Sequence, residues 1–266
     1  MPADPRVYDS DRLARCYASS RPPVHDTICA MLFAALPEDY EVHSALDIGC
    51  GAGASTAALV THATCVVGID PSLPMLLQAR RRLPTATFVQ AKADALPASA
   101  ASIDLVTAAG SLNYTDIDLS LAELARVLSP NGYLAIYDFS TGRVQPPGAP
   151  SGASFGSFER KFPWPSGYTM DVTRLPYTAH GLSLAFCDKF VVEICMSSEE
   201  YLEYVMSETN VEAAIAEGLN ELDARDACRR IFEPLFAGGS QKVAFNSVLA
   251  LARKEVDHAA AQSPTH

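Results

Sequence analysis

The stretch that decides the fold is Ala-Leu-Asp-Ile-Gly-Cys-Gly-Ala-Gly-Ala-Ser-Thr, residues 45–56. Apolar residues precede the glycines and predict a buried strand, and the small residues that follow predict a helix beginning near residue 54. Glycines lack a Cβ atom, so the backbone of such a turn can approach a ligand closely. A strand, a glycine-rich turn and a helix together predict a nucleotide-like cofactor at the carboxyl end of the strand.

Two classes of cofactor fit these glycines. Gly49, Gly51 and Ala54 satisfy the dinucleotide pattern G-x-G-x-x-G/A, a match that is weak by itself. Asp47 stands two positions before the first glycine. Its carboxylate would face the like charges of a pyrophosphate, but it can receive a cationic amino group. The sequence therefore favours a ligand that carries an ammonium group.

The segment from Asp47 to Gly53, Asp-Ile-Gly-Cys-Gly-Ala-Gly, resembles the first motif, D/E-x-G-x-G, of the class I methyltransferases. In that family the loop holds the methionine portion of S-adenosylmethionine. The resemblance implies S-adenosylmethionine as the cofactor and S-adenosylhomocysteine as its product. It also implies cofactor contacts by these residues of the loop: Asp47, Gly49, Cys50, Gly51 and Gly53.

The second predicted strand ends at Asp70, which lies 70 minus 47, or 23, positions after Asp47. At this place an acid binds ribose hydroxyls, in dinucleotide enzymes and in methyltransferases. The run Asp-Pro-Ser-Leu-Pro-Met-Leu, residues 70–76, resembles the D-x-S-x-x-M-L run of small-molecule methyltransferases. The resemblance implies cofactor contacts by Asp70, Pro71 and Met75, the last against adenine. A plain core position on the helix is the alternative interpretation of Met75.

The next motif departs from the family pattern. Residues 91–97, Ala-Lys-Ala-Asp-Ala-Leu-Pro, resemble the family's D-A-E-x-L-P segment, whose acid often binds the adenine amino group. Lys92 stands where that acid is usual. We therefore expect Asp94 or the backbone of Ala93 to bind the adenine in its place.

Two further motifs follow in family order. Residues 103–114 resemble the fourth motif, and the resemblance implies that the small residues Ala109 and Gly110 leave room for the sulfonium of the cofactor. Residues 123–138 resemble the E-x-x-R-V-L-x-P-G-G run and the fifth strand. Near the start, Tyr17 to Pro23 resembles a Y-x-x-x-R-P stretch, which implies that Tyr17 and Arg21 help to close the cofactor site. A surface position before the next helix is the alternative for Arg21.

The pattern of apolar runs predicts an α/β fold, a Rossmann-like, seven-stranded, mostly parallel sheet with helices on both faces and an inserted lid after the fifth strand. The predicted strands are near 43–48, 65–70, 86–90, 103–108, 132–138, 182–194 and 242–252. The predicted helices are near 54–62, 72–82, 117–128, 198–217 and 223–236.

We interpret residues 1–254 as a single domain. Its parts are a helical cap over 1–40, a cofactor-binding core over 43–140, a lid or substrate insertion over 141–182, and C-terminal strands and helices over 183–254. A disordered tail is expected over 255–266. The insertion is rich in proline and glycine but also in aromatic residues, which predicts an ordered wall over the sheet edge. Packing alone is the alternative for each of these aromatics.

The composition of the chain limits the classes of partner that it can bind. The formal charge is −11, from 20 basic and 31 acidic residues, and such a surface repels a nucleic-acid backbone. No apolar run reaches the roughly 20 residues of a membrane helix. The seven scattered cysteines predict neither a disulfide framework nor a metal site. We therefore expect a cytoplasmic protein with a small-molecule substrate, no nucleic-acid or membrane partner and no metal, and the sequence gives no indication of the oligomeric state.

Methyl transfer from a sulfonium requires alignment of the nucleophile and exclusion of water, and a general base only for a poor nucleophile. His180 is predicted as the best-placed histidine, because His25, His43 and His62 precede or end early elements. A solvated loop histidine is the alternative. Tyr114 is the second catalytic candidate. The candidates for contact with the substrate are Asn113, Asp138, Trp164 and Tyr177.

Taken together, the sequence predicts an S-adenosylmethionine-dependent methyltransferase that modifies oxygen, nitrogen or carbon of a small metabolite. The aromatic insertion favours an apolar or partly aromatic acceptor. Two alternatives stay open. One is a non-methylating binding or cyclisation scaffold on the same fold, which Lys92 favours. The other is a nicotinamide-dependent oxidoreductase, which shares the glycines and Asp70 but leaves Asp47 and the later motifs unexplained.

Overall fold

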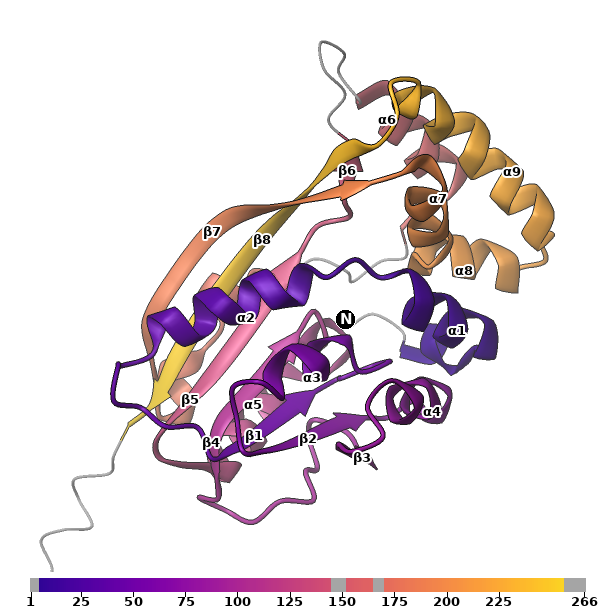
Figure 1. Cartoon of the computed structure of the whole chain (residues 1–266). Helices are drawn as coiled ribbons and strands as arrows, with labels where there is room; N and C mark the ends of the chain where they lie inside the picture. The colour runs from indigo at the N-terminus through magenta and orange to yellow at the C-terminus, as the bar shows by residue number, and fades with distance from the viewer. Residues whose placement is uncertain (1–4, 145–151, 165–169, 256–266) are drawn as a thin grey trace, which may run out of the picture.

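One twisted sheet runs through the structure, a computed structural model that describes residues 5–144, 152–164 and 170–255 (Figure 1). The sheet order is β3-β2-β1-β4-β5-β8-β6, and β7 also pairs with β8. Strands β1 to β5 are parallel, whereas β8 is antiparallel to both β5 and β7. The strands are β1 Ser44–Ile48, β2 Cys65–Asp70, β3 Thr87–Gln90, β4 Ile103–Ala109, β5 Leu128–Phe139, β6 Arg143–Val144, β7 Leu182–Met196 and β8 Gln241–Lys254.

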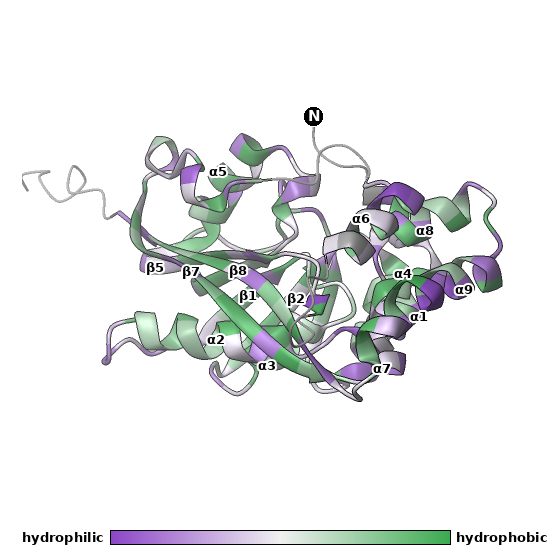
Figure 2. Ribbon diagram, turned by 90° about the horizontal axis from the view of Figure 1, so that it is seen from above, coloured by the Kyte–Doolittle hydropathy of each residue, from purple (hydrophilic) through white to green (hydrophobic). Residues whose placement is uncertain are grey.

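Helices cover both faces of this sheet, and Figure 2 shows α5 on one side and α2 and α3 on the other. Helix α2, Val24–Ala35, buries Ile28 and Leu32 against one face, and α5, Ile117–Val127, buries Leu121 and Leu124 against the other. Helix α3 is Ala54–Leu59 and α4 is Leu73–Arg82. Two apolar layers therefore enclose the strands, as a parallel sheet requires.

A second group of helices lies beyond the ends of the long strands β7 and β8 (Figure 1). It contains α6 Gly152–Lys161, α7 Ser198–Met206, α8 Thr209–Ala216 and α9 Glu221–Phe232. Buried aromatic rings hold this cluster together: Phe158 lies 5.2 Å from Phe232, measured between ring centroids, and Tyr201 lies at the same distance from Phe232. Helix α1, Asp11–Ser20, joins the cluster to the sheet because it contacts both α4 and α7.

The predicted fold class is confirmed, with eight strands instead of seven because the two-residue β6 also pairs with β8. The prediction of one helix over 198–217 is wrong. It is broken between α7 and α8, where the backbone of Glu208 is extended and its carboxylate forms an ion pair with Arg21.

The predicted lid over 141–182 is divided between two places. Helix α6 belongs to the C-terminal helical cluster, while Tyr177 packs in the core on the α5 side of the sheet. Residues 145–151 and 165–169 of this segment, and 256–266 of the predicted tail, lie outside the described residues. Among the residues that the structure describes, every helix is too short or too polar to cross a membrane.

We expect Phe158→Ala to lower the free energy of unfolding by about 3–5 kcal/mol, because a ring that is 1% exposed leaves a cavity behind. Urea denaturation, followed by circular dichroism, measures this change. The matched control is Leu222→Ala on α9, where the side chain is 70% exposed, and there the change should stay within about 0.5 kcal/mol. Equal effects of the two substitutions would contradict the assignment of Phe158 to a packed core.

Candidate functional site

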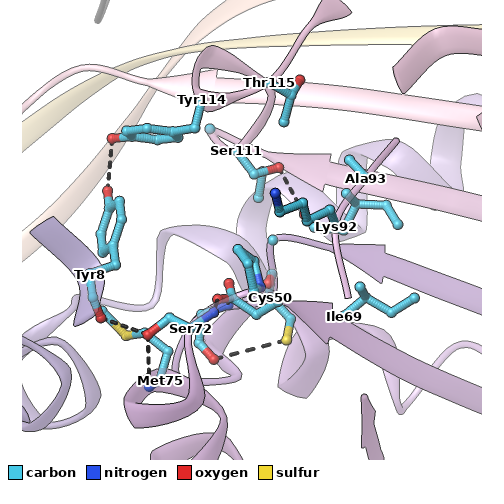
Figure 3. Close-up of a pocket in the computed structure, with 18 of the residues that line it drawn as sticks. Tyr8, Cys50, Ile69, Ser72, Met75, Lys92, Ala93, Ser111, Tyr114 and Thr115 are labelled. Atoms are coloured by element: carbon cyan, nitrogen blue, oxygen red, sulfur yellow. Dashed lines mark hydrogen bonds between the residues drawn. The ribbon is translucent and has the colours of Figure 1, made fainter. Parts of the chain in front are cut away.

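A cavity of about 400 Å³ opens at the carboxyl ends of β1, β2 and β4 (Figure 3). Its floor is the turn after β1, and its walls come from the first turn of α4, the segment after β3 and the segment after β4. Eleven of the predicted cofactor residues line it, namely Tyr17, Gly49, Cys50, Gly51, Asp70, Pro71, Met75, Ala93, Asp94, Ala109 and Gly110, and so does the catalytic candidate Tyr114.

The turn after β1 depends on its glycines. Gly49, Gly51 and Gly53 have φ angles of +66°, +51° and +81°, a region that other L-residues seldom adopt. A Cβ atom on Gly49 would lie 2.2 Å from the Cβ of Ser111, whereas a Cβ on Gly51 would meet nothing within 4 Å. Because Gly51 also lines the cavity, that open space is the space for a ligand.

Asp47 lies below this turn and outside the lining of the cavity. Its side chain is fully buried, and its carboxylate accepts hydrogen bonds from the hydroxyls of Ser55, Thr56 and Thr107 at 2.6, 2.7 and 3.0 Å. Burial raises the pKa of Asp47, and the three hydroxyls oppose that rise. The residue therefore fixes the start of α3 below the turn, and the structure does not bring its carboxylate to the cavity, where the sequence predicted contact with an amino group.

Asp70 closes the other side of the turn. The backbone N–H of Gly51 donates to its Oδ2 at 2.9 Å, and the N–H of Ser72 donates to its Oδ1 at 2.8 Å. Burial raises the pKa of Asp70 to about 6, although these two amides favour the charged form. The carboxylate lines the cavity and can accept further hydrogen bonds from a ligand that carries neighbouring hydroxyls.

The wall beyond Asp70 matches both interpretations of Met75. Its side chain lines the cavity and also packs in a small apolar cluster with Leu13 and Ala52. Lys92 and Asp94 lie on the segment after β3 and line the same wall. The position where the family usually has an acid is thus occupied by a cation at the cavity, as the sequence predicted.

The N-terminal segment forms a roof that the sequence analysis missed. The 3-10 helix η1, Pro5–Asp9, brings Tyr8 and Asp9 to the cavity. The hydroxyls of Tyr8 and Tyr114 are 2.9 Å apart, and the hydroxyl of Ser72 donates to the carbonyl of Tyr8 at 2.6 Å (Figure 3). No motif marks Tyr8 and Asp9, because tertiary packing alone brings them to the site.

Tyr17 and Arg21 separate in the structure. Tyr17 lines the cavity, while Arg21 is directed at the C-terminal helical cluster and lies outside the lining. The guanidinium of Arg21 forms an ion pair with Glu208 at 3.1 Å and donates to the carbonyl of Ser207 at 3.0 Å. It also stacks 4.0 Å above the centroid of the Tyr17 ring. Arg21 therefore supports the wall that Tyr17 forms.

His25 also lines the cavity, although the sequence analysis set it aside. It is the second residue of α2, and its Nδ1 lies 3.0 Å from the hydroxyl of Tyr137 on β5. Burial lowers the pKa of His25 to about 4, and the positive charges of Arg21 and Arg82 add to that effect. The early position of His25 in the chain gave no indication that α2 begins above the carboxyl end of β5.

Two predicted substrate residues lie just outside the lining. Asp138 accepts a hydrogen bond from the N–H of Phe139 at 2.8 Å and another from Asn113. Its Oδ1 lies 3.1 Å from the place of a Cβ on Gly110, so the carboxylate supports the segment after β4 from below. Burial raises the pKa of Asp138 to about 6.

The structure places the remaining site candidates elsewhere. Nε2 of His180 lies 3.1 Å from a carboxylate oxygen of Asp118 on α5, and the hydroxyl of Tyr177 donates to the carbonyl of Val172 at 2.7 Å. Trp164 lines a separate hollow of about 170 Å³ beside α6. Gly53 caps α3 behind the cavity. Within the described residues, no group of three His, Cys, Asp or Glu side chains is arranged to hold a metal ion.

Comparison with known proteins agrees with this geometry. Residues 46–136 match the sequence profile of the methyltransferase domain. The chain is 36% identical over 118 residues to a demethylmenaquinone methyltransferase of Beutenbergia cavernae, over 44% of this chain and 48% of that protein. It is 42% identical over 108 residues to a trans-aconitate 2-methyltransferase of Azoarcus sp., over 40% of this chain and 42% of that protein. The matches thus span less than half of the length of these relatives.

The likeness in structure extends further than the likeness in sequence. A solved structure from Anaeromyxobacter dehalogenans, described as that of a candidate type II methyltransferase, covers 87% of this chain and 97% of its own, with a TM-score of 0.65 and 21% identity. That identity supports the shared fold alone. Residues 46–136 therefore match a methyltransferase domain, and the chain shares its fold with that solved structure.

Proposed function

We propose that this protein is a methyltransferase that uses S-adenosylmethionine to methylate oxygen, nitrogen or carbon of a small molecule. The observation that carries the proposal is the cavity in which the amide of Gly51 holds the carboxylate of Asp70. The match of residues 46–136 to the methyltransferase domain supports it. The formal charge of −11 favours a small-molecule acceptor over a nucleic acid.

The residues of the cavity fit this cofactor. The open space above Gly51 admits a ligand close to the backbone, and the carboxylate of Asp70 suits a ribose diol. Met75, Ala93 and Asp94 would contact the adenine, and the turn after β1 would hold the methionine portion. Ala109 and Gly110 are small residues at the end of β4, and they leave space there for the sulfonium.

When bound, the cofactor supplies an activated methyl group with a good leaving group. The chain then has to hold the acceptor in line and keep water away, and these two tasks account for most of the catalysis. Tyr8, Tyr17 and Tyr114 form an aromatic roof over the cavity, and the hydroxyl contact between Tyr8 and Tyr114 joins the N-terminal segment to the loop after β4. This roof is suited to excluding water.

The acceptor itself is proposed only as a class. The relatives are named for demethylmenaquinone and trans-aconitate, which are both oxygen-containing small molecules. Both are reasonable first acceptors for this chain, and neither is assigned to it.

Calorimetric titration tests the proposal directly. We expect S-adenosylmethionine and S-adenosylhomocysteine to bind with micromolar affinity and NAD to give no heat, and we expect Asp70→Ala to abolish binding because the ribose loses its acceptor. Binding of NAD but not of S-adenosylmethionine would favour the oxidoreductase alternative. Binding of S-adenosylmethionine with no methyl transfer to any acceptor tried would favour the scaffold.

The affinity should depend on pH through Asp70. Its ionised carboxylate is a stronger acceptor for the ribose hydroxyls than the protonated acid, and its pKa in the free protein is raised to about 6. Protonation below that pH competes with the cofactor, so the Kd at pH 5 should be about tenfold higher than at pH 7. Asp138 has a similar pKa but lies outside the cavity. The Asp138→Asn variant should therefore still show the higher Kd at pH 5. A Kd that is constant from pH 5 to 7.5 would exclude this role of Asp70.

Gly51→Ala and Gly181→Ala form a matched pair. Both positions have a positive φ, +51° and +68°, and at neither would a Cβ meet another atom within 4 Å. Both substitutions should therefore lower the free energy of unfolding by about 1–2 kcal/mol. Only Gly51→Ala should also weaken binding of S-adenosylhomocysteine, because its methyl group enters the cavity. The same affinity in both variants would show that the ligand does not lie above Gly51.

A further inference from the structure

His25 stands at the one place where α2 meets the cavity. It lies in the first turn of α2, above the carboxyl end of β5, and its ring makes edge-to-face contacts with Tyr137 and Phe139 at centroid distances of 5.8 and 5.4 Å. Tyr137 is fully buried between α2 and the sheet. The imidazole is therefore held by the core while it also lines the cavity.

The position of His25 is far from the place proposed for the nucleoside. Asp70 ends β2, and the partner of His25 lies near the end of β5, with β1 and β4 between these strands. Neighbouring strands are about 4.8 Å apart, so Asp70 and Tyr137 are separated by about 14 Å across the sheet. His25 thus belongs to the side of Ala109 and Gly110, where the proposed sulfonium meets the acceptor.

The hydrogen bond to Tyr137 determines which nitrogen of His25 carries the proton. The phenol has one proton, and its possible acceptors are Nδ1 of His25 and the thiol of Cys29. An imidazole nitrogen is a stronger acceptor than a thiol sulfur, which favours donation from the Tyr137 hydroxyl to Nδ1, and this direction of the bond leaves the ring proton on Nε2. Within the described part of the chain, Nε2 makes no hydrogen bond to another residue.

The surroundings keep this imidazole neutral. Burial, the charges of Arg21 and Arg82, and the N-terminal end of α2 all disfavour a second proton on the ring. A neutral imidazole with a proton on Nε2 is a hydrogen-bond donor and a poor base. The same positive surroundings favour a partner atom with negative charge.

We propose that His25 binds the methyl acceptor by donating a hydrogen bond from Nε2–H to a carbonyl, enolate, phenolate or carboxylate oxygen, with Tyr137 as its positioning residue. This inference rests on the proposed function and narrows the acceptor to an oxygen-bearing molecule. His25 orients that oxygen, and with it the nucleophilic atom, toward the methyl group.

The first test separates acceptor binding from cofactor binding. Titration with S-adenosylhomocysteine should give the same Kd, within about threefold, for wild type and His25→Leu. The control is His43→Leu, because the His43 side chain is 71% exposed and lies outside the cavity. A loss of tenfold or more for His25→Leu alone would overturn the inference by making His25 a cofactor ligand. Failure of the wild type to bind would overturn the proposed function instead.

The second test uses turnover with reduced demethylmenaquinone and with trans-aconitate. We expect His25→Leu to lower kcat/KM for the acceptor by about thirtyfold or more, as for loss of one hydrogen bond to a charged oxygen. His25→Gln should recover most of that loss, because its amide can donate but cannot act as a base. Wild-type rates in His25→Leu would overturn the inference, and a loss in His25→Gln equal to that in His25→Leu would indicate a base instead of a donor.

The third test needs no acceptor. Nitrogen-15 NMR of histidine-labelled protein with S-adenosylhomocysteine should show His25 with its proton on Nε2, and Tyr137→Phe should shift that tautomer toward Nδ1 while the Kd for the cofactor product stays the same. A role of Tyr137 in packing alone would leave the tautomer unchanged. A proton on Nδ1 in the wild type would overturn the inference, because Nε2 could then only accept.

Discussion

The hydrogen bond from the Gly51 amide to the Asp70 carboxylate is the contact on which the site depends. It joins the turn after β1 to the end of β2, two segments that approach each other only because the strands are parallel neighbours. Both partners line the same cavity. The bond therefore fixes the curvature of the turn and also holds a buried acid at the place where a ligand can reach it. The hydroxyls around Asp47 serve the same turn from below.

The two ends of the cavity are built by different means. At the end proposed for the nucleoside, short-range motifs set the geometry, since Asp70, Ser72 and Met75 follow one another on one strand-to-helix connection. At the opposite end, the walls come from distant parts of the chain. Tyr8, Tyr17 and His25 belong to the N-terminal segment, and they meet Tyr114 of the segment after β4 and Tyr137 of β5 only in the folded state. A wall that comes from distant segments can change without altering the turn between β1 and α3, so one fold can serve different acceptors.

This division explains how much could be predicted. The strands through β5 were predicted because local periodicity determines them, and eleven of the fourteen predicted cofactor residues line the cavity. The placement of His180, Tyr177 and Trp164 could not be predicted from the sequence, since the position of a connecting segment depends on the face against which it packs. His25 was missed for the opposite reason. It was set aside as a histidine that precedes or ends an early element, whereas the chain folds back so that α2 begins above β5.

The place of β8 has a consequence for the order of folding. The last strand of the described chain lies between β5 and β7, and it pairs with β7 along its whole length and with β5 through residues 247–253. Until residues 241–254 have left the ribosome, β5 is an edge strand with apolar side chains, and the long β7 has no partner in the sheet. Exposed edges of this kind attract other chains. Nascent or truncated chains that lack β8 are thus the forms most prone to aggregate, because the sheet is complete only when residues 241–254 are present.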